Sequence, residues 1–180
     1  MTIFKKFWSD LLNLSKFHFA CKYVFPSVAI ILTWGCLGNF YQTQLDKSQL
    51  VQNKGQVNSI DVVFEQGTKS SYKYYPLIIS LTNSEINFRI RDKFDDWFPF
   101  LENEIHIGDT IQIFTRTKIQ TLLGWGERGD VYLIEKGGKL IFPTSIVREY
   151  NVGQAKAFLF LALLFWTPYV LYTLNVINPK

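Results

Sequence analysis

The sequence predicts a membrane α+β protein in which two transmembrane helices flank a small antiparallel β-barrel or sandwich. Two uncharged apolar segments, residues 23–41 and 157–177, carry this prediction. A helix of about 20 residues, at about 1.5 Å rise per residue, crosses the roughly 30 Å hydrocarbon core of a bilayer. Between these segments the apolar residues alternate with period two, which is typical of β-strands.

The expected organisation has four parts. They are an amphipathic interfacial helix (1–22), a first transmembrane helix (23–42), a β domain (50–150) and a second transmembrane helix (156–177). In the first part, a Trp/Phe/Leu face lies opposite a lysine-containing face, as in helices that lie in the membrane interface. The charged start of a signal anchor and lipidation at Gly35-Cys36 are the alternatives for this end of the chain.

The distribution of charge predicts the topology. Four lysines precede the first span, whereas only Lys47 and Lys54 follow it closely. The positive-inside rule then places both termini in the cytoplasm and the β domain on the extracytoplasmic side of a plasma (inner) membrane. Residues 44–155 carry thirteen Lys/Arg and fourteen Asp/Glu, so the net charge of +4 comes from the ends of the chain. A nucleic-acid partner is therefore not expected, and the expected partners are the lipid bilayer and another membrane protein or a second copy.

The β domain contains five alternating segments. They are 56–65, 75–81, 86–90, 109–113 and 131–142, and the last is divided by Gly137-Gly138 into a hairpin. An irregular or helical insert is expected at 92–103, between the third and fourth strands, which suggests an OB-like arrangement. The domain has no cysteine, because Cys21 and Cys36 both border the first span, so its core must be held by burial alone.

The stretches IGDTIQIFTR (107–116) and VYLIEKGGKLIFP (131–143), enclosed by two spans, carry a resemblance. The chain resembles uncharacterised small bacterial two-span membrane proteins with a β-barrel-like domain between the spans. This resemblance implies an architecture and no activity.

No catalytic, cofactor-binding or metal-binding residues are predicted, and no cofactor is expected. His106 is the only histidine of the β domain and lacks a cysteine or an orienting partner for nucleophilic chemistry. The acids between Asp92 and Glu104 leave one enzymatic alternative, a metal-assisted hydrolase, although their spacing is not that of an EF-hand loop. An enzyme is thus the less favoured interpretation.

Aromatic residues are the candidate partner contacts. Trp97, Phe98 and Phe100 lie in the acidic insert, and Trp125 lies between two glycines. Aromatic side chains supply much of the binding energy in interfaces, although those of the insert could instead close the domain core. The tripeptide Arg128-Gly129-Asp130 is attributed to chance.

The favoured function is a membrane-anchored binding or assembly module, and a protective, immunity-type membrane protein acting through its helices is a further alternative.

Overall fold

The computed structural model describes residues 16–66, 73–124, 126–127, 129–174 and 176. The chain divides into two compact units, one formed by residues 1–40 and 152–180 and the other by residues 41–151. The predicted amphipathic helix lies largely outside the described residues, which begin with α2 (Lys16–Phe19) and the π-helical turn η1 (Ala20–Val24).

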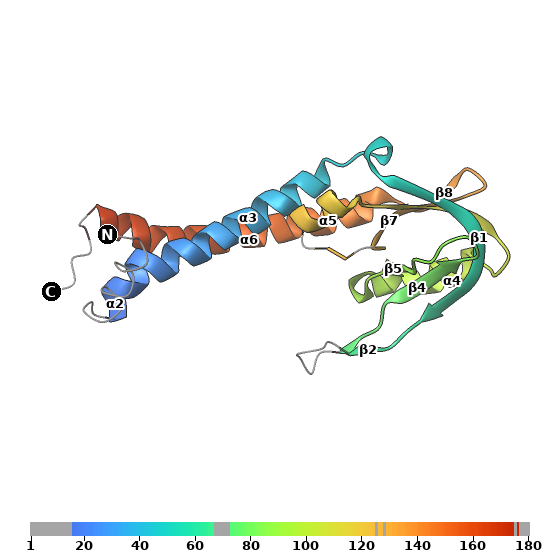
Figure 1. The fold of residues 1–180 in the computed structure, drawn as a ribbon, viewed down its shortest axis with the longest axis horizontal. Helices are drawn as coiled ribbons and strands as arrows, with labels where there is room; N and C mark the ends of the chain where they lie inside the picture. Colours follow the sequence, from blue (N-terminus) through green and yellow to red (C-terminus); the bar gives the residue numbers. More distant parts are fainter. Residues whose placement is uncertain (1–15, 67–72, 125, 128, 175, 177–180) are drawn as a thin grey trace. The chain divides into compact units, whose positions relative to one another are not determined.

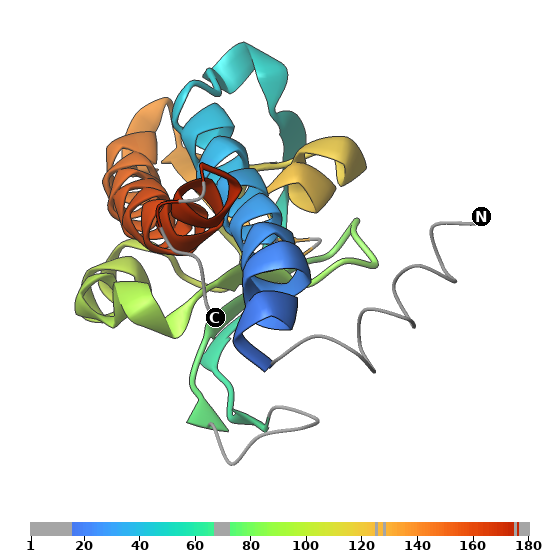
Figure 2. The same ribbon diagram turned by 90° about the vertical axis from the view of Figure 1, so that its left-hand side faces the viewer.

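The first unit is built from two long helices, α3 (Phe25–Thr43) and the larger part of α6 (Thr144–Thr173). They run side by side in both views (Figures 1 and 2). Trp166 Nε1 donates a hydrogen bond to Thr33 Oγ1 at 3.2 Å. A Cβ atom on Gly35 would lie 3.1 Å from the Phe158 ring, so the glycine allows close packing at this point.

Both helices are long and apolar enough to cross a membrane. The candidate spans are Lys16–Thr43 and Thr144–Thr173, with 28 and 30 residues. Their apolar side chains are mostly exposed, as the exposed fractions of Ile30 (59%) and Phe160 (64%) illustrate. Exposed apolar surface of this extent is expected where lipid, not water, surrounds a helix. The second helix begins at Thr144, twelve residues before the predicted span at 156.

The second unit is a six-stranded antiparallel sheet with the order β5-β4-β1-β6-β7-β8. Its strands are β1 (Val51–Val62), β4 (Leu77–Leu81), β5 (Phe88–Ile90), β6 (Thr110–Thr115), β7 (Val131–Lys136) and β8 (Lys139–Phe142). A separate two-stranded ladder joins β2 (Glu65–Gln66) to β3 (Lys73–Tyr74). The predicted antiparallel pairing is confirmed, including the β7–β8 hairpin, whose glycines 137 and 138 have φ of 58° and 83°.

The sheet is not closed into a barrel, so that part of the prediction is wrong. The long strand β1 pairs through its first half with β6 and through its second half with β4, with a register shift after Val57. The ladder then ends at β5 and at β8. Among the described residues, the backbone pairing that joins β5 to the segment before β7 is a single isolated parallel bridge between Arg89 and Asp130.

The helical insert follows β5, as predicted, and consists of the 3₁₀ segment η3 (Asp92–Trp97) and the helix α4 (Phe98–Glu104). A short helix that the sequence did not predict, α5 (Lys118–Leu123), lies between β6 and β7. The core is aliphatic and aromatic, and its fully buried members include Leu77, Phe88, Ile111, Ile134 and Phe142.

Candidate partner-binding site

The predicted aromatic contacts differ in their exposure. Phe98 belongs to the core and is 6% exposed, Trp97 is half-buried, and Phe100 is 41% exposed. Trp125 lies outside the described residues. Only Phe100 among the described three presents a large part of its ring at the surface.

Edge-to-face aromatic contacts hold the insert against Phe142 of β8 and Tyr150 of α6. Phe94 makes edge-on contacts with Phe142 and Tyr150, with ring centroids 5.9 and 5.8 Å apart. Trp97 also contacts Phe142, at 5.9 Å, and Phe100, at 5.8 Å. Edge-to-face pairs at these separations stabilise a fold beyond their buried area. The insert is therefore a rigid support for the residues on its outer side.

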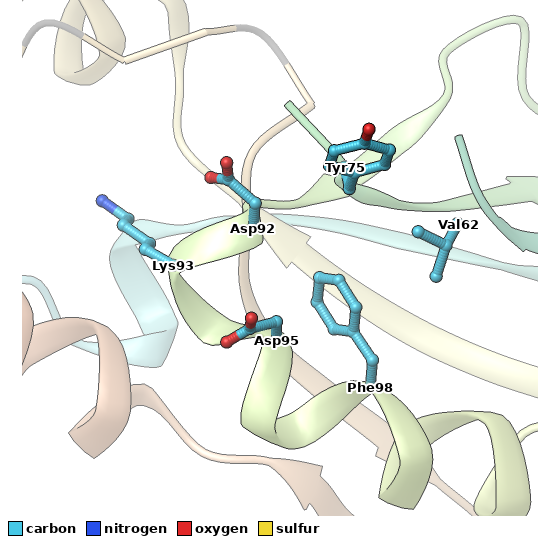
Figure 3. A pocket seen from close by; sticks show the side chains of 6 residues that line it. All are labelled: Val62, Tyr75, Asp92, Lys93, Asp95 and Phe98. Atoms are coloured by element: carbon cyan, nitrogen blue, oxygen red, sulfur yellow. The ribbon is translucent and has the colours of Figure 1, made fainter. Parts of the chain in front are cut away.

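An open pocket of about 670 Å³ lies at the start of the insert (Figure 3). Its lining residues come from the end of β1, the residue after β3, and the insert; they are Val62, Tyr75, Asp92, Lys93, Asp95 and Phe98. The picture shows Tyr75, Val62 and Phe98 gathered on one side, with the two carboxylates and the lysine on the other. A divided lining of this kind suits a ligand with an apolar part and a polar part.

The acidic side of the pocket is not neutralised by ion pairs. Within the described part of the chain, neither Asp92 nor Asp95 forms a salt bridge. Burial and the charge of Arg91 lower the pKa of Lys93 to about 7. The Tyr150 ring, whose centroid lies 3.1 Å from Lys93 Nζ, favours the charged ammonium but does not outweigh these two effects. Near neutral pH, the pocket thus carries a net negative charge.

The apolar side of the pocket continues along the chain. Val62, Val63 and Phe64 are 45%, 40% and 51% exposed, and the Phe64 ring lies 5.5 Å from that of Tyr75. Tyr75 itself is 49% exposed. Consecutive exposed apolar side chains at the end of a strand are unusual in a water-facing domain and mark a candidate contact surface.

A buried polar network lies beside the insert. Asp130 Oδ2 accepts hydrogen bonds from the Arg91 guanidinium, from Arg116 Nη2 at 2.8 Å and from the Glu127 amide at 3.0 Å. The side chains of Asp130 and Arg116 are only 6% and 4% exposed. Burial lowers the pKa of Arg116. At the more exposed Arg91, burial is outweighed by the hydrogen bond and the charge of Asp130, and the pKa is raised. One carboxylate therefore binds two guanidinium groups. Arg91 immediately precedes the pocket residue Asp92, so its bond to Asp130 holds the chain at the start of the pocket.

The same network includes the first and last turns of the second unit. Gln42 Oε1 accepts hydrogen bonds from Arg116 Nη1 at 2.7 Å and from the Tyr132 hydroxyl at 3.0 Å. Asn151 Nδ2 donates to the Tyr132 hydroxyl at 2.9 Å. Burial raises the pKa of Tyr132 to about 12, so its hydroxyl keeps the proton that it donates. Gln42 is the second residue of the unit 41–151 and Asn151 is its last, so the network ties both ends of this unit together.

Two glycines before Asp130 allow the chain to pass over this network. A Cβ atom on Gly124 would overlap the Gln42 amide, and one on Gly126 would overlap the Arg116 guanidinium. Gly124 and Gly126 thus allow close packing, because a side chain at either position would have no space. Asp130, the last residue of the Arg-Gly-Asp tripeptide, is buried and is not a surface recognition residue.

The acids proposed for a hydrolase do not converge. Among the described residues, no group of three His, Cys, Asp or Glu side chains could hold a metal ion. Glu104 pairs with Lys139 at 3.1 Å, and Asp109 pairs with Lys136 at 2.5 Å. The hydrogen bond from Lys136, together with that from the His106 amide, lowers the pKa of Asp109. His106 is exposed, and its Nδ1 atom lies 3.8 Å from Asp109.

Sequence reasoning singled out Phe98 as a partner contact and Asp92 and Asp95 as acids of a possible hydrolase, but it missed Val62, Tyr75, Lys93 and the network. Val62 and Tyr75 lie far from the insert along the chain, so no local spacing joins them to Phe98. Comparison with known proteins gives no matching family model, no matching curated protein and no matching solved structure.

Proposed function

We propose that this protein is a membrane-anchored binding module whose β domain captures a segment of another membrane protein. The observation that carries the proposal is the open pocket with an apolar side and two carboxylates without ion pairs. The spans anchor the domain, and the insert, fixed by Phe94 and Arg91, holds the pocket in shape. No reacting group is needed for this role.

The chemistry of the pocket defines the partner. Val62, Tyr75 and Phe98 accept an apolar or aromatic side chain, while Asp92 and Asp95 favour a Lys or Arg close to it. Electrostatic complementarity supplies specificity and speeds association more than it adds affinity. The proposed partner segment therefore combines one large apolar side chain with an adjacent basic one. Trp97 and Phe100, on the same insert, are proposed as additional contacts.

The proposal also includes a membrane location with a defined topology and an OB-like arrangement of the strands. We place the protein in a bacterial plasma membrane, with both termini in the cytoplasm and the β domain outside, on the strength of the lysines before the first span. An OB-like relationship is supported by the strand order and by the insert between β5 and β6. The hydrolase gains no support from the described residues, among which no group of three His, Cys, Asp or Glu side chains could hold a metal ion.

Capture from native membranes in mild detergent tests the function. The decisive pair is Asp95→Asn, which changes the pocket, and Asp96→Asn, its exposed neighbour in η3 that does not line the pocket. A stoichiometric partner should be retained by wild type and Asp96→Asn and depleted several-fold by Asp95→Asn. Equal retention by both variants, or the absence of any partner of wild type, would refute the proposal.

A further inference from the structure

Helix α5 has its polar and apolar sides reversed relative to a helix of a water-soluble domain. Gln120 is buried, with 7% exposure, whereas Ile119 and Leu122 are 72% and 76% exposed. Ile119 and Leu122 are three positions apart, so they share one face of the helix. In water, this arrangement would leave two large aliphatic side chains exposed to solvent, while the polar Gln120 side chain occupies a buried position.

The reversed orientation is specified by hydrogen bonds. Thr117 caps the helix by accepting a bond from the Gln120 amide at 3.2 Å, and the Gln120 side-chain oxygen accepts from the Thr117 amide at 2.8 Å. Gln120 Nε2 also donates to the Gln49 carbonyl at 3.0 Å. Both the oxygen and the nitrogen of the Gln120 side-chain amide are thus hydrogen-bonded on the inner side of the helix. These bonds fix the rotation of α5 about its own axis, so Ile119 and Leu122 point outward.

The end of α5 lies against Gln42, which is in the last turn of α3 at the end of the first span. Gly124, which caps α5, is packed so closely on the Gln42 side chain that a Cβ atom there would overlap the amide. Gln42 comes directly after the uncharged segment 23–41. If that segment fills the bilayer core, Gln42 lies at the membrane surface, and its close contact with Gly124 brings the end of α5 to that surface.

We infer that α5 is a membrane-contact helix whose Ile119 and Leu122 side chains enter the acyl boundary of the lipid bilayer. Lys118 precedes them and provides a charge for anionic headgroups. A helix of six residues is about 9 Å long, which suits contact within the interface and not insertion across it. This inference rests on the crossing of the membrane by α3 and is independent of the pocket and its partner.

Photo-crosslinking tests lipid contact with an exposure-matched control. Benzoylphenylalanine is placed singly at 119, 122 or 107 in the full chain, reconstituted into phosphatidylcholine–phosphatidylglycerol vesicles, and lipid adducts are measured by mass after irradiation. Ile107 is 72% exposed, as Ile119 is, but lies in the turn before β6. The six residues of β6 separate that turn from α5 by about 20 Å.

Several-fold more lipid adduct at 119 and 122 than at 107 is the expected result. Equal adduct at all three positions, adduct at none, or adducts only with a second copy of the chain would overturn the inference. A thermal unfolding midpoint unchanged by each substitution shows that the labelled proteins are folded. As a second measurement, Ile119→Ser with Leu122→Ser should reduce lipid adduct from a probe at 118 several-fold, and no reduction would also contradict lipid contact.

Discussion

Asp130 and Asp95 are two carboxylates of the same unit with opposite surroundings. Asp130 is 6% exposed at its side chain and accepts three hydrogen bonds, two of them from arginines. Asp95 is exposed, lines an open pocket and makes no salt bridge with a described residue. The difference separates residues that hold the domain together from residues available to a partner, and it can be tested by comparing folding with binding.

Removal of the buried charge gives the largest expected effect. Asp130→Asn leaves Arg91 and Arg116 without their carboxylate, and breaking a buried ion pair costs about 3–5 kcal/mol of unfolding free energy. Asp95→Asn should change that free energy by less than about 0.5 kcal/mol, because exposed substitutions rarely do more. Urea unfolding in mild detergent measures both. Equal stability of the two variants would remove the distinction between the two regions.

A methyl group placed over the network should have the next largest effect. Gly126→Ala puts a Cβ atom where the Arg116 guanidinium lies, and Arg116 cannot move without losing Gln42 and Asp130. Overpacking of this kind costs about 1–3 kcal/mol. Gly153→Ala is the matched control, since its Cβ would meet nothing within 4 Å. In a helix, that change should stabilise by up to about 1 kcal/mol. Equal changes in unfolding free energy at the two glycines would show that Gly126 is not packed against the Arg116 guanidinium.

Lys93 lies beside both regions and should give an effect that depends on pH. Its pKa falls from 10.5 to about 7 on folding, so the unfolded chain binds more protons between these values and stability rises with pH across that interval. Besides Arg91, the groups that act on Lys93 are Arg116, Asp130, Asp92 and the Tyr150 ring.

Substitution of Lys93 isolates this contribution. Lys93→Met should stabilise the protein most at and below about pH 7, and the gain should shrink as the pH approaches about 10. Unfolding midpoints of wild type and variant across this range measure the change, with the exposed Lys54→Met as control. A gain from Lys93→Met that does not vary with pH would contradict a lowered pKa.

Local patterns predicted the spans, the strand pairs and the hairpin at Gly137-Gly138, because periodicity and turn chemistry depend on neighbouring residues. The open sheet was not predicted, since closure depends on pairing between strands that are far apart in the sequence, and only the isolated bridge between Arg89 and Asp130 forms there. Asp130 was interpreted as part of a chance tripeptide because its partners, Arg91 and Arg116, lie 39 and 14 residues away. Helix α5 was missed because its six residues make fewer than two turns, which is too short a segment for a helical period to be recognised.

The most direct test of the central claim is photo-crosslinking at the pocket in native membranes. Benzoylphenylalanine at Tyr75, which lines the pocket and is 49% exposed, is compared with the same probe at Tyr74, which is 39% exposed and does not line it. The account predicts one protein adduct from position 75 that is several-fold stronger than any from position 74 and that Asp95→Asn reduces. Identical adducts from both positions, or none from position 75, would contradict a partner-binding pocket.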